Sequence, residues 1–176
     1  EPLNAERLKA HVSGGTARGV CPIKAGEHTT RIAVLDFDSH KGETPFDTML
    51  EVATQVADSL TLYGLEPVAW RSSGGKGVHL YVLWDEPQDA YSVRQALCDV
   101  LATCGLEEGG GGVSRGQVEI YPRQDEVAVG GQGLLVDLVA PPTARLGFGV
   151  VGDGAGVGGD LDRVVPPVLD AALVVG

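Results

Sequence analysis

Two stretches of the chain place apolar side chains at the three-to-four-residue spacing that is typical of amphipathic helices. The first covers residues 45–63, with Thr44 as a candidate N-cap and Gly64 as the stop. The second runs from about Gln88 to Cys104 and stops at Gly105. We therefore expect two helices, each packing one face on a core.

Short apolar and β-branched runs between these helices predict strands. Two of these runs follow one another directly and are expected to form a hairpin. The order strand, helix, strand, strand, helix, strand, strand predicts an α+β domain, with helices packed on a mixed β-sheet. The expected strands are Arg31–Phe37, Pro67–Trp70, Val78–Trp84, Val118–Tyr121 and Leu134–Val139.

The length of the chain, 176 residues of which 43% are hydrophobic, allows one sizeable core. Glycines gather at 109–112, where we expect a flexible loop, and at 147–159, where we expect poor order because glycine loses much entropy on folding. Residues 1–145 are therefore expected to form the folded domain. Residues 146–176 are expected to be a Gly- and Val-rich segment, partly flexible or leading into a further domain. The chain begins with Glu1 rather than Met, which favours a piece of a longer protein.

The formal net charge of −11 argues against a strong, independent DNA-binding domain, because phosphate neutralisation normally requires a basic face. The negative charge would have to serve a metal site, or another domain would have to hold the DNA. The three scattered cysteines fit no zinc spacing and are expected to be buried free thiols in a reducing, cytoplasmic compartment. No segment resembles a signal peptide, and no apolar run approaches the roughly 20 residues of a membrane span.

The first candidate site is Asp36-Phe37-Asp38, at the end of the first predicted strand. Side chains two positions apart on a strand point to the same face, so both carboxylates project together. Two such carboxylates repel each other unless a cation lies between them, and oxygen ligands of this kind suit Mg²⁺ or Mn²⁺. The alternative is that both are solvated residues at the end of a strand.

The second candidate is the small, donor-rich loop that precedes a predicted strand. Its glycines are expected to expose backbone N–H groups, and Lys76 supplies a charge that seeks phosphate. His79 follows on the strand and shares a face with Tyr81. It is not a P-loop, because no Ser or Thr follows the lysine and a strand rather than a helix comes next. The loop residues are Ser72, Ser73, Gly74, Gly75, Lys76 and Gly77.

The third candidate is the strand Val118–Tyr121 with the residues after it. Glu119 and Tyr121 share one face and offer a further acid for a metal site. Arg123 and Arg115 lie nearby in sequence and could meet phosphates.

The three candidates, in this order, resemble the archaeo-eukaryotic primase superfamily. They are most similar to the primase-polymerases of bacterial and phage conflict systems (TOTE-type) and to CRISPR-associated ones. The shared features are D-x-D at a strand end, S-G-G-K-G-x-H leading into a strand, and E-[VIL]-[FY]-P-[KR]-Q. The resemblance runs from Leu8 to Leu138 and implies an RRM-like primase-polymerase core.

The resemblance also implies a role for each position. The metal ligands and catalytic acids would be Asp36, Asp38 and Glu119, with Asp137 as the alternative third acid. The nucleotide-binding residues would be Ser72, Ser73, Gly75, Lys76, Gly77, His79 and Arg123.

The activity implied is template-dependent nucleotidyl transfer by two Mg²⁺ or Mn²⁺ ions, with NTPs or dNTPs as substrates and a DNA template and primer as partners. Helicase or primer-handling domains in a longer chain would be further partners, and no membrane is expected. Two alternatives stay open. One is a haloacid-dehalogenase-type phosphatase, although His40 stands where Thr or Val is required. The other is a catalytically inactive domain that binds nucleotides or nucleic acid.

Overall fold

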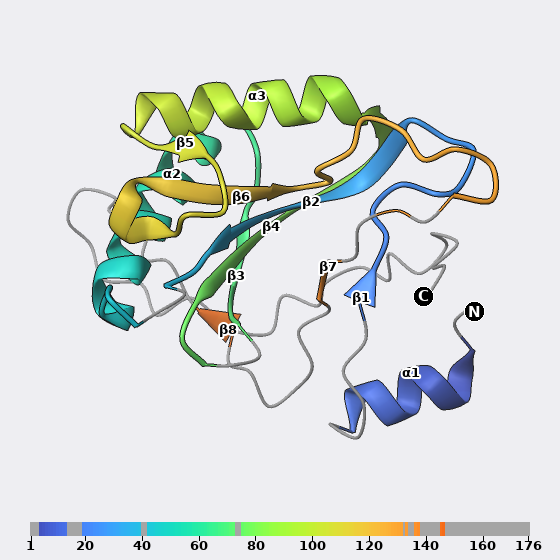
Figure 1. Ribbon diagram of the computed structural model, residues 1–176, viewed down its shortest axis with the longest axis horizontal. Helices are drawn as coiled ribbons and strands as arrows, with labels where there is room; N and C mark the ends of the chain where they lie inside the picture. The colour runs from blue at the N-terminus through green and yellow to red at the C-terminus, as the bar shows by residue number, and fades with distance from the viewer. Residues whose placement is uncertain are drawn as a thin grey trace.

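The computed structural model describes residues 4–13, 19–39, 42–72, 75–131, 133, 136–137 and 145–146. These residues form an α+β domain, as predicted, in which α2 and α3 lie on one side of a mixed sheet (Figure 1). The strand order of this sheet is β5-β6-β2-β4-β3-β8. The helices are α1 (Ala5–Val12), α2 (Phe46–Leu62), α3 (Ala90–Thr103) and the 3-10 helix Val113–Arg115. The strands of the sheet are β2 (Thr29–Phe37), β3 (Val68–Arg71), β4 (Val78–Asp89), β5 (Glu107–Glu108), β6 (Gln117–Tyr121) and β8 (Arg145–Leu146).

Strand β2 is the centre of the sheet and runs antiparallel to both of its neighbours, β4 and β6. Strands β3 and β4 form the predicted antiparallel hairpin, and β5 pairs with β6 in parallel. Strand β4 continues five residues beyond the predicted end at Trp84, because its last residues pair with Thr29 and Thr30 on the far side of an irregularity in β2. Helix α3 consequently begins at Ala90 rather than near Gln88.

One face of the sheet packs against α2 and α3 and forms the main core. The apolar stripe predicted for each helix is buried there, and burial of each large apolar side chain contributes roughly 1.5–3 kcal/mol. The buried helical residues are Met49, Ala53, Val56, Ala57 and Leu60 in α2, and Ala90, Val93, Leu97, Val100 and Leu101 in α3.

Of the two ends predicted for α2, the C-terminal end agrees with the structure and the N-terminal cap does not. Its C-terminal end is as expected, since Gly64 has a φ of +80° and the N–H of Leu65 donates to the carbonyl of Leu60. Its N-terminal cap was predicted wrongly. Pro45 occupies the N-cap position without a side-chain hydrogen bond. Thr44 is buried instead, and its backbone N–H donates to Ser39 Oγ at 2.9 Å.

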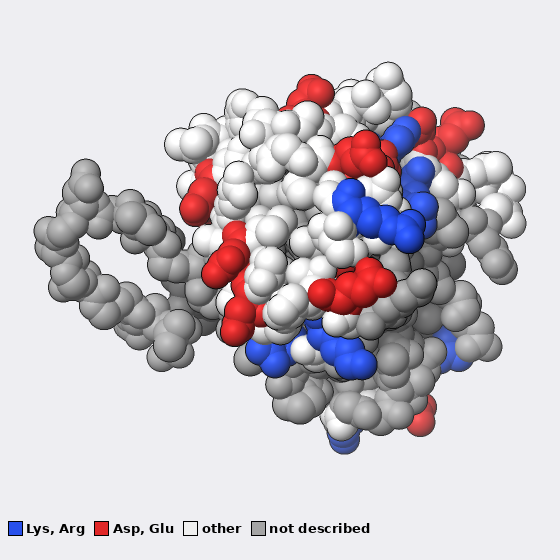
Figure 2. Space-filling model, turned by 60° about the vertical axis from the view of Figure 1, so that its left-hand side comes forward, with Lys and Arg blue, Asp and Glu red and all other residues white. Residues whose placement is uncertain are grey.

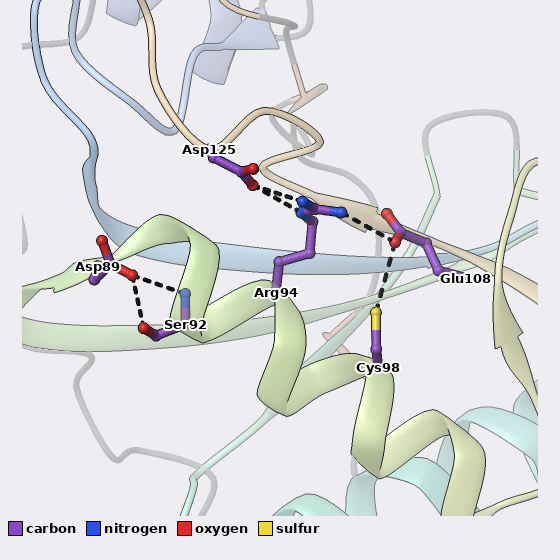
Figure 3. Close-up of polar contacts among 6 residues, drawn as sticks. All are labelled: Asp89, Ser92, Arg94, Cys98, Glu108 and Asp125. Atoms are coloured by element: carbon purple, nitrogen blue, oxygen red, sulfur yellow. Dashed lines mark hydrogen bonds and ion pairs between the residues drawn. The ribbon is translucent and has the colours of Figure 1, made fainter.

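A capping hydrogen bond at its N-terminus and ion pairs along one side hold helix α3 in place (Figure 3). Asp89 caps the helix by accepting hydrogen bonds from the N–H and the hydroxyl of Ser92. Arg94 then forms ion pairs with Asp125, at 2.6 Å, and with Glu108, at 3.5 Å. One side chain therefore ties the helix both to β5 and to the segment after β6.

The three cysteines are free thiols and are half-buried rather than fully buried as predicted. Cys98 lies close to Glu108, with 3.5 Å between Sγ and Oε2 (Figure 3). Burial, and then the negative charge of Glu108, raise the pKa of this thiol.

A second, two-stranded sheet pairs β1 (Gly19–Val20) with β7 (Val136–Asp137). Strand β7 is the described part of the strand predicted over residues 134–139. Of the predicted C-terminal segment 146–176, the structure describes Leu146, which belongs to β8. The glycine-rich stretch 147–159 and the residues after it lie outside the described residues, as do Ser73, Gly74 and His40. None of the helices in the described ranges is long and apolar enough to cross a membrane.

Candidate active site

Asp36 stands at the centre of a row of polar side chains that crosses the sheet. It is directly opposite His79 of β4 on one side and Glu119 of β6 on the other. Residues directly opposite in adjacent strands point to the same face, so the three side chains lie side by side. Their chain neighbours Leu35 and Ile120 point the other way, into the core under the helices. The row therefore lies on the face of the sheet away from α2 and α3.

His79 is held by a partner at each ring nitrogen. Its Nε2 is 3.2 Å from Asp36 Oδ1, and its Nδ1 is 3.5 Å from the hydroxyl of Tyr81. The side chain of His79 is 9% exposed, whereas that of Asp36 is 28% exposed. The imidazole is thus fixed in orientation, while the carboxylate beside it stays open to solvent.

Glu119 has partners of its own. Its Oε2 accepts a hydrogen bond of 2.8 Å from the Tyr121 hydroxyl and lies 3.5 Å from a guanidinium nitrogen of Arg123. The shared face predicted for Glu119 and Tyr121 is confirmed by this contact. Arg123, which was predicted to bind nucleotide, forms an ion pair with Glu119 in this structure.

Tyr121 carries the largest change in acidity around the row. Its partial burial, followed by the hydrogen bond to Glu119 and the negative charge of that carboxylate, raises its pKa to about 12.

We predict that Tyr121 titrates near pH 12. The folded state then keeps a proton that the unfolded chain releases from about pH 10. Stability contributed by this group is therefore complete below pH 10 and is lost as the pH rises toward 12. Ultraviolet titration of phenolate in the wild type and in Tyr121→Phe measures it. A phenolate signal near pH 12 that is unchanged in Tyr121→Phe would contradict the assignment.

Asp38 follows the last residue of β2 and is held through its backbone and its side chain. Its Oδ1 accepts a hydrogen bond of 2.6 Å from the N–H of Ser39. Its carbonyl accepts another from the N–H of Val113, in the 3-10 helix before β6. The position of Asp38 is thus set by contacts with the next residue, Ser39, and with the 3-10 helix.

The loop between β3 and β4 closes on itself through Ser72. The Ser72 hydroxyl accepts from the N–H of Gly77 at 2.9 Å, and its carbonyl accepts from the N–H of Gly75 at 2.8 Å. The prediction that the glycines expose free N–H groups is therefore wrong for these two, because the hairpin turn uses those donors internally. Lys76 is exposed, and Ser73 lies outside the described residues.

Gly77 brings this loop against the end of β2. A Cβ atom at this position would lie 2.7 Å from the carbonyl oxygen of Phe37, so only glycine allows the approach. Since Phe37 lies between the two aspartates, the loop lies at the same end of the sheet as both.

The two carboxylates of the row, together with that of Asp38, suit a hard divalent cation. Asp36, Asp38 and Glu119 all supply carboxylate oxygens, the ligands that Mg²⁺ and Mn²⁺ take in proteins. Within the described ranges, no group of three or more His, Cys, Asp and Glu side chains stands ready to hold a metal ion. In this structure Asp36 lies against His79, and Glu119 against Tyr121 and Arg123. A shared cation would replace the contacts with His79 and Arg123, whereas the Tyr121 hydroxyl could keep donating to Glu119, because each carboxylate oxygen has two lone pairs.

Comparison with known proteins decides the family. A family model for the archaeo-eukaryotic primase domain of TOTE conflict systems matches residues 1–142. The chain belongs to this family. The match includes every acid of the row and confirms the resemblance drawn from the sequence motifs. The match also argues against the alternative of a haloacid-dehalogenase-type phosphatase.

The primase domain is also similar to a solved structure, the polymerase domain of Mycobacterium tuberculosis Ligase D in complex with DNA. The two are 25% identical, and the match covers 64% of this chain with a TM-score of 0.45. The primase domain spans 42% of that chain. A comparison with curated protein sequences gives no match.

The sequence motifs of the primase domain did not indicate two neighbours of the row. Tyr121 was placed on the correct face but was given no role. Gly110 was taken only as part of a flexible loop, although a Cβ there would lie 2.7 Å from Glu119 Oε1. The glycine cluster was the one available signal, because consecutive glycines also mark a close approach of the backbone.

Proposed function

We propose that the primase domain is a nucleotidyltransferase that joins nucleotides on a DNA template with the help of Mg²⁺ or Mn²⁺. The observation that carries this proposal is the row of Glu119, Asp36 and His79 on the face of the sheet away from α2 and α3. Membership of the primase family supports the reaction class. The expected substrates are NTPs or dNTPs, with a primer or template strand as the second reactant.

Each acid of the site has a defined part in the proposal. Asp36, Asp38 and Glu119 would hold the cations, and Glu119 is preferred to Asp137 as the third acid. The strand register places Glu119 opposite Asp36, whereas the backbone of Asp137 pairs with Gly19 in the separate two-stranded sheet. When bound, the cations would neutralise phosphate charge and make the attacking 3′-hydroxyl more acidic.

The nucleotide triphosphate is assigned to the other side of Asp36. His79 lies on the same face as Asp36, and its ring would meet a phosphate oxygen by exchanging one of its two present contacts, with Asp36 or with Tyr81. Lys76 is exposed on a loop at the same end of the sheet and can supply a positive charge. Contact with the triphosphate is also proposed for Ser72, Ser73 and Arg123, whereas Gly75 and Gly77 would shape the loop, since their N–H groups are bonded within the turn.

Template-directed incorporation tests the proposal. A labelled primer on a template, incubated with nucleotides and Mn²⁺ or Mg²⁺, should be extended by the wild type and should not be extended in excess EDTA. Nucleotide binding without extension under all conditions would identify a catalytically inactive binding domain instead. Extension that is unchanged in EDTA would exclude the metal-assisted reaction.

We further predict that this chain binds DNA weakly by itself. Its net charge of −11 repels the phosphate backbone, and salt screens this repulsion over about 10 Å at 0.1 M. On the face shown in Figure 2, basic side chains form small groups separated by acidic and uncharged ones. Additional domains of a longer chain would then make the contacts that hold the DNA.

Fluorescence anisotropy with labelled DNA, at matched salt, compares this chain with the full-length protein. Tight binding by this chain alone, weakening steeply as salt rises, would show a basic groove despite the net charge.

A further inference from the structure

The carboxylate of Glu119 is contacted at both of its oxygens. At Oε2 the Tyr121 hydroxyl donates a 2.8 Å hydrogen bond, with Arg123 at 3.5 Å. At Oε1 the neighbour is the backbone of Gly110, so close that an added Cβ atom would lie 2.7 Å away. A glutamate side chain has three rotatable bonds, and contacts at both oxygens restrict all of them.

The backbone around Gly110 is fixed relative to Glu119. Strand β5 pairs in parallel with β6, with Glu108 opposite Val118, and the N–H of Gly109 donates to the carbonyl of Val118 at 3.0 Å. Gly110 therefore comes directly after Gly109, which is hydrogen-bonded to Val118, the residue before Glu119.

Space rather than backbone conformation requires glycine at position 110. Its φ is not in the left-handed region, in contrast to Gly112 at +80° and Gly116 at +69°. An alanine at 110 is consequently compatible with the backbone. Its methyl group would meet the tip of the Glu119 side chain, which can rotate away. The substitution should move the carboxylate and leave the fold in place.

We propose that Gly110 and Tyr121 are positioning residues that hold the Glu119 carboxylate on the face it shares with Asp36, each acting at one of its two oxygens. Tyr121 fixes Oε2 by donating a hydrogen bond, and Gly110 leaves room for Oε1 by having no side chain. This inference rests on the proposed function in assigning Glu119 to the cation site. The placement of the carboxylate itself is independent of that assignment.

The test compares Gly110→Ala and Tyr121→Phe with Gly109→Ala as the matched control. Alanine at 109 adds the same methyl group to the same loop, but there it would meet the Gln117 side chain, 2.7 Å from Cδ. Removing an outer partner of a metal ligand typically lowers metal affinity about 10- to 100-fold. We expect Gly110→Ala and Tyr121→Phe each to weaken Mn²⁺ binding, measured by electron paramagnetic resonance, by about 10-fold. Gly109→Ala should bind Mn²⁺ like the wild type.

A second readout requires neither metal nor activity. With ¹³C-labelled glutamate carboxyl groups, the Glu119 signal is assigned by its loss in Glu119→Gln. This signal should shift in Gly110→Ala and Tyr121→Phe and stay in place in Gly109→Ala. In the Glu119→Gln background, Gly110→Ala should cause no further loss of primer extension.

Three results would overturn the proposal: a Glu119 signal that is unmoved in Gly110→Ala, equal effects of the two alanines, or a Gly110→Ala defect that persists in full without the Glu119 carboxylate. A wild type that neither binds Mn²⁺ nor extends primers would instead refute the proposed function. The carboxyl signal would still decide whether Gly110 and Tyr121 position Glu119.

Discussion

Replacement of Asp36 and Asp38 together by alanine is expected to abolish template-directed incorporation. These two acids stand on either side of Phe37, the last residue of the central strand, and Asp36 lies between His79 and Glu119. Removing both takes away two carboxylates of the proposed cation site. The loss of several kcal/mol of charge stabilisation corresponds to a decrease of about 10³-fold or more in the rate. Primer extension under single-turnover conditions measures this decrease.

The fold is expected to survive this double substitution. Asp36 is partly exposed, and Asp36, Asp38 and Glu119 carry like charges at one end of the sheet, so removing two of them relieves repulsion. Asp58→Asn is the matched control, because Asp58 is an exposed carboxylate on α2, away from the site. Thermal unfolding followed by circular dichroism should give similar midpoints for all three proteins. A folded double variant that extends primers at the wild-type rate would refute the metal-assisted mechanism.

The second large effect is expected for His79→Ala. The imidazole is held between Asp36 and Tyr81 and is assigned to the triphosphate. A hydrogen bond to a charged group contributes about 1.5–3 kcal/mol, so nucleotide affinity should fall by about 10- to 100-fold. Lys76→Ala should lower the affinity as well, but by less, because an exposed ammonium group is screened by solvent.

Isothermal titration with a nucleoside triphosphate in the presence of divalent cation measures both affinities. His28→Ala and Lys24→Ala are matched controls, since both residues are exposed in the segment before β2 and have no assigned role in the site. The wild type and the two control variants should bind alike. If His79→Ala and Lys76→Ala also bind like the wild type, the nucleotide is held elsewhere and the assignment is wrong.

The sequence by itself determined the local features of this protein. Apolar spacing located α2 and α3 and the faces that they bury, because a helix packs along a single stripe. The two-residue period of strands placed His79 with Tyr81, and Glu119 with Tyr121, on the faces where the structure has them. The order of three short motifs was sufficient to indicate the family, which the comparison confirms.

Only the tertiary structure decided how these pieces meet. Asp36, His79 and Glu119 are each at least 40 residues apart in sequence, and the strand register that aligns them depends on pairing between distant segments. The same pairing extended β4 beyond its predicted end and turned the donors of Gly75 and Gly77 inward. It also brought Gly110 against Glu119. A local pattern fixes the face to which a side chain points, but its neighbour on that face depends on the packing of the whole chain.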